Sequence, residues 1–456
     1  MAQPQAAALS VLGKCSSSYR KALDEKYWCR CWRVEMTQTL PRVIVVPRRC
    51  WSAVEIAAAV ILVSALIAPQ PLRAQKFEIL YAFKGGSDGL APTGNMARDA
   101  AGNLYGTTGD GGNSTACSGG CGTIFKLDPQ GKETVLHSFS GTDGSFPYSV
   151  ILDGSGNLYG VTIFGGNSCI PGFGTCGVVF KFDTTTNTLT LLHKFKGGSD
   201  GENPESSLIL DGDGNLYGTT VAGGVGCLNQ SPPGCGILFK IDKNGRKTIL
   251  YRFDGDGGED PSSGLLLSSN GNFYGATIEG GAFLPSVFDY ICCHGTVFKV
   301  DPKGKETVLH SFSGLTPDNG VPYAQLIEDE EGNLYGTTEF HPPGSTIFGT
   351  VFKISKNGGP MKDLFTFNDS DGGYPLAGLT RDSSGNLYGT VSGGFACECG
   401  GVFKLDPQGR MTVLHQFDGR DGEFPQSVLL LDGAGNLYGN AAGGPHDAGI
   451  VFRITP

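Results

Sequence analysis

The sequence carries little charge, since Asp, Glu, Lys and Arg together make up 17% of its 456 residues. The balance is acidic, with a formal net charge of −10, and no stretch of Lys and Arg is interleaved with aromatic residues. Nucleic acid and anionic membrane surfaces are therefore disfavoured as partners. A Ser/His/Asp order, a P-loop and a dinucleotide fingerprint are also missing. We therefore predict no catalytic residues of these kinds.

A long apolar run, "SAVEIAAAVILVSALIA" at residues 52–68, follows three arginines and precedes "PQPLRAQ". This order predicts a signal peptide over residues 36–76, with cleavage after Ala74 and an extracytoplasmic (periplasmic or secreted) mature protein. Residues 1–35 would then be an upstream extension or a misassigned start, because Met36 could begin the chain. The alternative is a membrane anchor, since about 17 apolar residues approach the length that spans a bilayer.

Glycine is abundant, at 72 residues, and much of it belongs to a repeated word. Gly-Asn-(Leu/Phe)-Tyr-Gly occurs seven times, with tyrosines at 105, 159, 217, 274, 335, 388 and 438. Each copy lies among four β-patterned runs, which we call a ("SVILD"), b ("NLYGTT"), c ("TIFKLD") and d ("ETVLHSF"). Four strands in every 50 to 61 residues are typical of a β-propeller blade.

The two ends of the repeat region complement each other. It begins at residues 77–83 with a d strand, "FEILYAF", and ends with a c strand, "IVFRIT". The N-terminal strand can therefore complete the last blade and remove the exposed edges of an open stack. We predict an all-β fold over residues 77–456, a closed seven-bladed β-propeller with four-stranded blades.

The a–b turn of copy three, "LDGDGN", resembles the start of a calcium loop because Asp211, Asp213 and Asn215 alternate with other residues. An EF-hand would need a glutamate at the twelfth position, where Ala222 stands. Asp-x-x-Gly-Asn recurs in six copies, with Ser268 in the fourth, whereas the second acid is present only as Asp213 and, in copy five, as Glu331. We therefore predict a hairpin turn held by the aspartate and not a calcium site.

Other residues recur once in nearly every copy. A ring residue occupies one position of strand d, as His137, His193, His310, His415, Tyr81, Tyr251 and Phe365. The d–a connections carry Asp88, Asp143, Asp200, Asp256, Asp318, Asp371 and Asp421. We expect the rings to pack between blades and the aspartates to cap their own loops, although a ring of acids could also hold cations. A catalytic group is needed once, so sevenfold repetition indicates a scaffold.

The b–c loops differ from one another and hold ten cysteines, two in each of five loops. For an exported chain we predict the disulfides Cys117–Cys121, Cys169–Cys176 and Cys227–Cys235. The close pairs Cys292/Cys293 and Cys397/Cys399 are harder to bridge, so they are candidates for strained, reduced, redox-active or cross-paired cysteines. No Cys-x2-Cys spacing is present in the loops, and we predict no metal site there.

The b–c loops also supply the candidate ligand-binding residues. Acids and histidines outside the repeat could face one another where blades four and five meet, near several aromatic side chains. The candidates are Glu279, Phe283, Tyr290, His294, Glu339, Phe340, His341 and, in another loop, His446. The alternative is that the histidines simply lie on the loop surface.

The words "GNLYGTT…GG" and "GTVFKLDPQGKETVLHSFSGxDG" resemble the GloVer tandem-repeat proteins of bacteria, over roughly residues 77 to 456. The resemblance implies an extracytoplasmic chain with a choice of C-terminal anchors and without an established activity. This sequence departs from that plan by ending without a sorting tail, so anchoring at the cell surface is not expected. The repeats are more loosely similar to NHL and gluconolactonase-like propellers, which include binding modules and metal-dependent hydrolases.

We therefore expect a monomeric, exported binding scaffold that recognises a glycan, a small molecule or a protein through its b–c loop face. The alternatives are an enzyme acting on a polysaccharide or lactone, with calcium, and a structural surface component. Six a strands begin "PYS", "PES", "PSS", "PYA", "PLA" and "PQS". These segments are poor in acids and histidines, which favours binding over catalysis. We expect no other cofactor.

Overall fold

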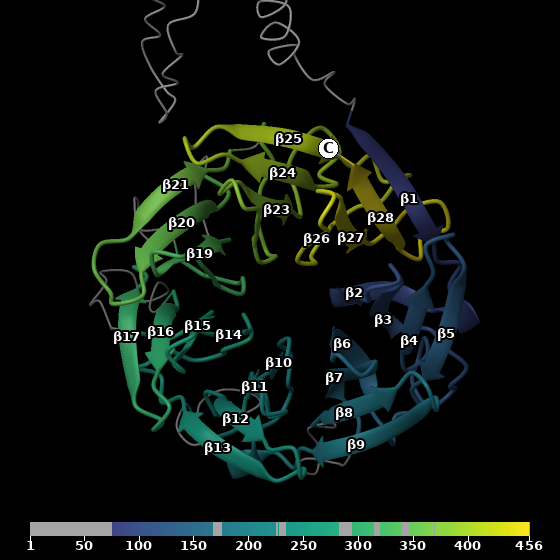
Figure 1. The fold of residues 1–456 in the computed structure, drawn as a ribbon, viewed down its shortest axis with the longest axis horizontal. Coiled ribbons are helices and arrows are strands. Elements are labelled where there is room, and N and C mark those ends of the chain that lie inside the picture. Colours follow the sequence, from purple (N-terminus) through teal and green to yellow (C-terminus); the bar gives the residue numbers. More distant parts are fainter. Residues whose placement is uncertain are drawn as a thin grey trace, which may run out of the picture. The chain divides into compact units, whose positions relative to one another are not determined.

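The computed structural model describes residues 75–166, 176–224, 227, 234–281, 294–313, 320–339, 347–368 and 370–455. Within these ranges the chain forms seven four-stranded antiparallel sheets arranged around a central axis (Figure 1). The predicted seven-bladed propeller is confirmed. Nearly all of the predicted leader lies outside the described residues. In the part that is described, no helix has the length and apolar character of a membrane span.

The first three blades follow the predicted order a, b, c, d from the axis outward. Blade one consists of β2 (Leu90–Arg98), β3 (Leu104–Asp110), β4 (Thr123–Leu127) and β5 (Glu133–Ser138). Blade two consists of β6 (Ser145–Leu152), β7 (Asn157–Phe164), β8 (Val178–Asp183) and β9 (Thr188–Lys194). Blade three consists of β10 (Ile209–Leu210), β11 (Leu216–Thr220), β12 (Ile237–Ile241) and β13 (Lys247–Arg252). Short 3-10 turns at Gly86–Asp88 and Gly198–Asp200 lie in two d–a connections.

The remaining blades repeat the plan with short inner strands. Blade four consists of β14 (Leu265–Leu267), β15 (Phe273–Thr277), β16 (Thr296–Val300) and β17 (Glu306–Ser311). Blade five consists of β18 (Ile327–Glu328), β19 (Asn333–Thr338), β20 (Thr350–Ser355) and β21 (Lys362–Thr366). Blade six consists of β22 (Thr380–Arg381), β23 (Leu387–Val391), β24 (Gly401–Leu405) and β25 (Met411–Gln416). Blade seven consists of β26 (Leu430–Leu431), β27 (Leu437–Ala441), β28 (Ile450–Thr455) and β1 (Lys76–Ala82).

Blade seven closes the ring. Strand β1, from the start of the described chain, pairs antiparallel with the last strand, β28, from Lys76↔Thr455 to Ala82↔Ile450 (Figure 1). Across this pair Arg453 donates to the Glu78 carboxylate at 2.7 Å. The predicted closure by the N-terminal strand is confirmed, so the outer edge of β28 in the last blade is covered.

Adjacent blades are held together by a repeated aromatic pair. The phenylalanine that follows each d strand packs against the phenylalanine in strand c of the next blade, with ring centroids 5.1 to 5.7 Å apart. The same c-strand ring lies over the second glycine of Gly-Asn-Leu-Tyr-Gly. A Cβ on Gly106 would lie 2.6 Å from Cζ of Phe125, and the other copies are as tight. The repeated glycine is therefore needed so that the ring can cross strand b.

The a–b turns are built by their aspartate, as predicted. In blade three, Asp211 accepts the Asp213 and Asn215 backbone N–H groups through Oδ1 and the Asn215 amide and Tyr217 hydroxyl through Oδ2. The same pattern surrounds Asp99, Asp153, Asp329, Asp382 and Asp432. Four donors occupy each carboxylate, which leaves little capacity for a calcium ion.

The repeated rings of strand d bond to the aspartates of the following connection. His137, His193 and His415 lie 2.8 to 3.0 Å from Asp143, Asp200 and Asp421, and Tyr81 donates to Asp88 at 2.9 Å. These aspartates also accept backbone N–H groups of their own loops, as Asp143 does from Ser140. The predicted capping role is therefore confirmed at these positions.

Candidate functional site

The d–a and b–c segments lie on the same face of the ring, which we call the loop face. In every blade the residue before the proline that begins strand a donates its backbone N–H to the residue that ends the preceding blade's b–c loop, at 2.7 to 3.3 Å. In blade four, for example, Asp260 donates to the Cys235 carbonyl. The following proline packs against a glycine of the same neighbour, and a Cβ on Gly122 would lie 2.4 Å from Pro147 Cδ. Each blade is thus linked to the one before it.

The seven residues before these prolines share a left-handed backbone, although none is a glycine. Their φ angles lie between 48° and 61°, at Ala91, Phe146, Asn203, Asp260, Val321, Tyr374 and Phe424. Such a conformation costs of the order of 1 kcal/mol or more in bulky and β-branched residues. The linkage to the preceding blade holds it in place. The left-handed conformation also directs the chain after the proline into the inner strand, which lies nearest the axis.

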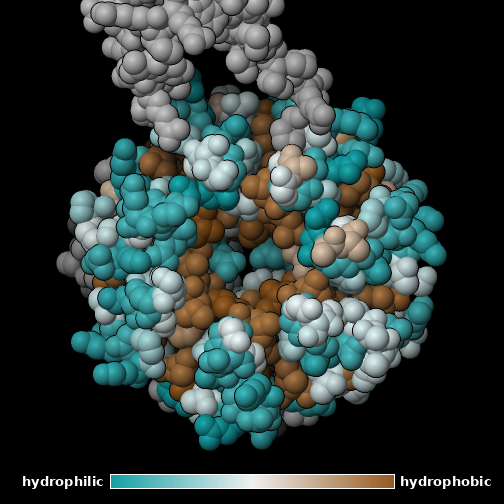
Figure 2. All heavy atoms as spheres, in the orientation of Figure 1, coloured by the Kyte–Doolittle hydropathy of each residue, from teal (hydrophilic) through white to brown (hydrophobic). Residues whose placement is uncertain are grey.

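These segments and the ends of strand b bring acids and tyrosines from four blades close enough to affect one another's pKa values. Tyr148 of blade two, Glu205 of blade three, Asp260 and Glu279 of blade four, and Tyr323 and Glu339 of blade five influence one another's ionisation. Blades two and five are not neighbours in the ring, so such residues can approach one another only across the channel. Figure 2 shows a hollow at the centre of the ring. We call these six residues the mouth cluster.

Burial and like charge dominate the electrostatics of the mouth cluster. Burial raises the pKa of Asp260 to about 7, and the charges of Glu205, Glu279 and Glu259 add to this effect. Burial likewise raises the pKa of Glu205. Burial and the neighbouring carboxylates raise the pKa of Tyr323 to about 12, so its hydroxyl stays protonated and can donate. The cluster offers carboxylates that accept hydrogen bonds, neutral hydroxyls that donate, and an acid that titrates near neutral pH.

Polar side chains narrow the channel further along the inner strands. Asn95 of blade one donates to Ser207 of blade three at 3.0 Å and accepts the Val428 backbone N–H of blade seven at 3.0 Å. Ser149 of blade two also bonds to Ser207, at 2.5 Å. The mouth therefore opens onto a polar constriction that joins four blades.

The candidate residues from the sequence are only partly brought together. Glu279 and Glu339 both belong to the mouth cluster. His294 ends the blade-four loop, where its carbonyl accepts the Val321 N–H at 2.7 Å. His446 is exposed in the loop of blade seven, two blades from Glu339. The other candidates, Phe283, Tyr290, Phe340 and His341, lie outside the described residues.

Sequence reasoning missed Tyr148, Glu205, Asp260 and Tyr323. Each lies immediately before or after the proline that begins an inner strand. These segments contribute more to the site than their composition suggested. The position of these residues in the sequence was the signal that could have identified them. The residues that flank this proline are the ones that each blade turns toward the axis, so single acids and aromatic residues there were site candidates.

The described cysteines form disulfides that cross-link the loops of the loop face. Cys117 is joined to Cys121, Cys227 to Cys235, and Cys397 to Cys399. Cys176 is disulfide-bonded as well, while Cys169, Cys292 and Cys293 lie outside the described residues. Cys397 and Cys399 are thus neither reduced nor paired with another loop.

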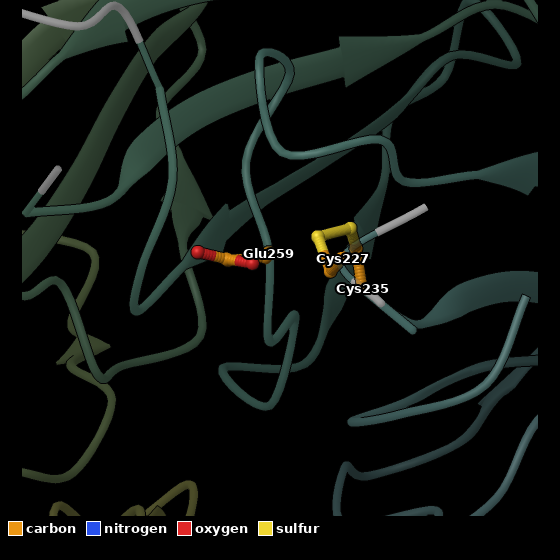
Figure 3. Close-up of side chains that lie close together, drawn as sticks. All are labelled: Cys227, Cys235 and Glu259. Carbon is orange, nitrogen blue, oxygen red and sulfur yellow. A yellow bond between two sulfur atoms is a disulfide. The ribbon is translucent and has the colours of Figure 1, made fainter. Parts of the chain in front are cut away.

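Within the described ranges, the only three potential metal ligands that converge are Cys227, Cys235 and Glu259 (Figure 3). The two sulfur atoms are joined to each other, so they are not thiolates that could bind a metal ion. A separate cleft of about 300 Å³ lies at the turns between blades one and two, lined by Tyr105, Lys126, Asp128, Lys132, Thr134, Leu136 and Thr184. Residues of strands β3, β4 and β5 and of the adjoining turns line this cleft.

The sequence matches the Gloeobacter/Verrucomicrobia repeat over residues 70–288 and 226–452. The chain therefore belongs to this repeat family, as the repeated words indicated. No curated protein matches the sequence.

Solved propellers resemble the fold at low identity. The extracellular domain of a hybrid two-component system from B. thetaiotaomicron is 14% identical, with a TM-score of 0.51, and the match covers 83% of this chain and 41% of that one. The chain thus spans less than half the length of that structure. A gluconolactonase from Xanthomonas campestris is 16% identical, with a TM-score of 0.42 and coverage of 86% and 92%. At such identity the first likeness shows the fold alone.

Proposed function

We propose that the protein is an exported scaffold that binds a neutral or amine-bearing carbohydrate at the mouth cluster. The observation that carries this proposal is the meeting of three carboxylates, an acid with a pKa of about 7 and two tyrosines over the axis. Sugar hydroxyls both donate and accept hydrogen bonds, and tyrosine rings offer flat apolar surface. Like-charge repulsion from the carboxylates disfavours acidic sugars and other anions.

Export is part of the proposal and has separate support. The chain has a leader-like segment at residues 36–76, and the described loops contain disulfides, which persist in oxidising compartments. Disulfides also limit the freedom of loops that surround the mouth. Loops ordered before binding lose less entropy when a ligand arrives.

A catalytic role is the second candidate, because Asp260 has the ionisation of a general acid or base. Burial raises its pKa to about 7, and Tyr323, whose pKa is raised in part by the Asp260 charge, lies nearby. This pair would suit hydrolysis of a lactone or polysaccharide. Turnover of a bound sugar or lactone that is lost in Asp260→Asn would favour this candidate over a binder.

The test is a screen of neutral, amino and acidic glycans against the purified protein, with and without EDTA, followed by calorimetry on any hit. We expect binding of neutral or amino sugars that weakens at least about tenfold in Tyr323→Ala. Val413→Ala is the control, because it removes an exposed apolar side chain (36%) on the outer strand β25, away from the axis. Preference for acidic glycans would contradict the proposal. The absence of any ligand would leave a structural surface role.

A further inference from the structure

Glutamate accompanies cysteine at the contacts between blades on the loop face. The residue that ends the b–c loop is a cysteine in four blades, namely Cys121, Cys176, Cys235 and Cys399, and is His294, Phe348 or Ala448 in the others. Facing each of them in the next blade is the residue two positions before the proline. In the same order it is Ser145, Glu202, Glu259 and Glu423, and then Gly320, Gly373 and Leu90. Glutamate thus occurs beside three of the four cysteines and beside none of the other three residues.

The carboxylates lie close to the sulfur atoms. Glu202 Oε2 is 3.9 Å from Cys176 Sγ, and the Glu202 side chain is 1% exposed. A carboxylate oxygen of Glu259 lies within 4.8 Å of both Cys227 Sγ and Cys235 Sγ (Figure 3). In blade six a Cβ on Gly419 would lie 3.9 Å from both Cys399 Sγ and Glu423 Oε2. Glu202 is buried and Glu259 and Glu423 are half-buried, and removing a carboxylate from water is costly, so the repeated placement calls for a physical role.

A carboxylate at this distance opposes reduction of the disulfide. An external thiolate opens a disulfide by forming a bond to one sulfur, while the S–S bond breaks and its electron pair passes to the other sulfur as a thiolate. Cys235 has no exposed surface, so attack reaches Cys227 and the new thiolate forms on buried Cys235. The Glu259 charge repels both the incoming anion and this leaving anion.

We propose that Glu202, Glu259 and Glu423 are electrostatic shields that protect the loop disulfides of blades two, three and six against anionic thiols. The Cys117–Cys121 bridge of blade one faces Ser145 and has no glutamate at this position. Anionic thiols that reach the protein therefore open the blade-one loop before the buried blade-three bridge, while the loops beside the mouth cluster stay stapled.

The test measures how the charge of the attacking thiol changes the rate of opening. The full-length protein is treated at pH 8 with glutathione, which is anionic, or cysteamine, which is cationic, and each cysteine is mapped by alkylation and mass spectrometry. Glu259→Gln should speed the opening of Cys227–Cys235 by glutathione at least about fivefold, and by cysteamine clearly less, because with cysteamine only the repulsion of the leaving thiolate is relieved. Glu330→Gln is the control, because it makes the same change of net charge at an exposed site.

A second variant adds the shield where it is missing. Ser145→Glu should slow the opening of Cys117–Cys121 by glutathione about fivefold and by cysteamine clearly less. Equal acceleration of both thiols in Glu259→Gln would mean that the substitution loosened the loop, and it would overturn the proposal. Unchanged glutathione rates in both variants would overturn it as well, whatever the glycan screen finds.

Discussion

The turn aspartates and the acids beside the mouth lie in opposite electrostatic environments, although the loop face also carries bonded aspartates, such as Asp143 and Asp200, whose pKa values are lowered. On the face of the a–b turns, six aspartates each accept hydrogen bonds from their own turn, and their pKa values are lowered. Burial alone would raise the pKa of Asp329, but the hydrogen bonds from Asn333 and Tyr335 and the charge of Lys353 hold it at about 2. On the loop face, burial raises the pKa values of Glu202, Glu205, Glu259 and Asp260.

The difference follows from what surrounds each carboxylate. A turn aspartate has four donors aimed at its two oxygens, so the charged form is stabilised. Asp260 Oδ1 is buried without a hydrogen-bond partner among the described residues, and other acids crowd it. The turn face thus uses charge to hold the fold. The loop face keeps charge at a cost in stability, which is the arrangement expected of a binding site.

The largest expected effect comes from removing a turn carboxylate. Asp211→Ala should lower the free energy of unfolding by about 1 to 3 kcal/mol, because four donors lose their acceptor. Chemical denaturation measures this change. Asp213→Ala is the matched control, since Asp213 lies two residues away in the same turn with an exposed side chain, and it should change stability by less than about 0.5 kcal/mol. Equal losses would mean that the turn depends on local charge and not on the bonds to Asp211.

On the loop face, removing a carboxylate should raise the free energy of unfolding instead of lowering it. Asp260→Asn should raise the free energy of unfolding at pH 8 by on the order of 1 kcal/mol, because it removes a buried charge that other acids repel. The same denaturation experiment measures it, with Glu330→Gln as the exposed control. A loss of stability at pH 8 would show that the Asp260 charge has a stabilising partner, and the contrast between the faces would fail.

The fold could be predicted almost completely because its signals are local and repeated. Six of the seven copies carry a turn aspartate, and all seven carry Gly-Asn-(Leu/Phe)-Tyr-Gly and a pair of phenylalanines, so seven weak signals support one interpretation. Closure of the ring followed from the strand types at the two ends. Glu279 and Glu339 could be found because each directly follows a b strand of neighbouring blades.

The rest of the mouth cluster depends on geometry that no local pattern encodes. Tyr148 and Tyr323 belong to blades that are not adjacent and meet only across the axis. Asp260 points there because of a left-handed backbone, with a φ of 57°, which sequence propensities do not predict for a non-glycine residue. The repeated link between blades sets this conformation. The backbone carbonyl of the candidate residue His294 takes part in that link.

The pH dependence of stability should separate the two faces. Asp329 has a folded pKa of about 2, below its unfolded value, so its contribution is present above about pH 4 and is lost as the pH falls toward 2. Asp260 has a folded pKa of about 7, above its unfolded value, so stability is lost as the pH rises from about 4 to about 7. Unfolding curves at a series of pH values should show both losses. Asp329→Asn should reduce only the loss of stability at acid pH, and Asp260→Asn only the loss of stability near neutral pH.

The smallest expected effect is that of calcium. The turn carboxylates already accept four hydrogen bonds each, and in the described part of the chain no three carboxylates converge as a ready cation site. Calcium could therefore be held only weakly, by the mouth cluster, and millimolar calcium should raise stability by less than about 1 kcal/mol. Thermal unfolding with calcium and with EDTA measures this shift, which should vanish in Asp260→Asn and persist in Asp211→Ala. A shift that instead vanishes in Asp211→Ala would place the ion in the turns and reverse the roles assigned to the two faces.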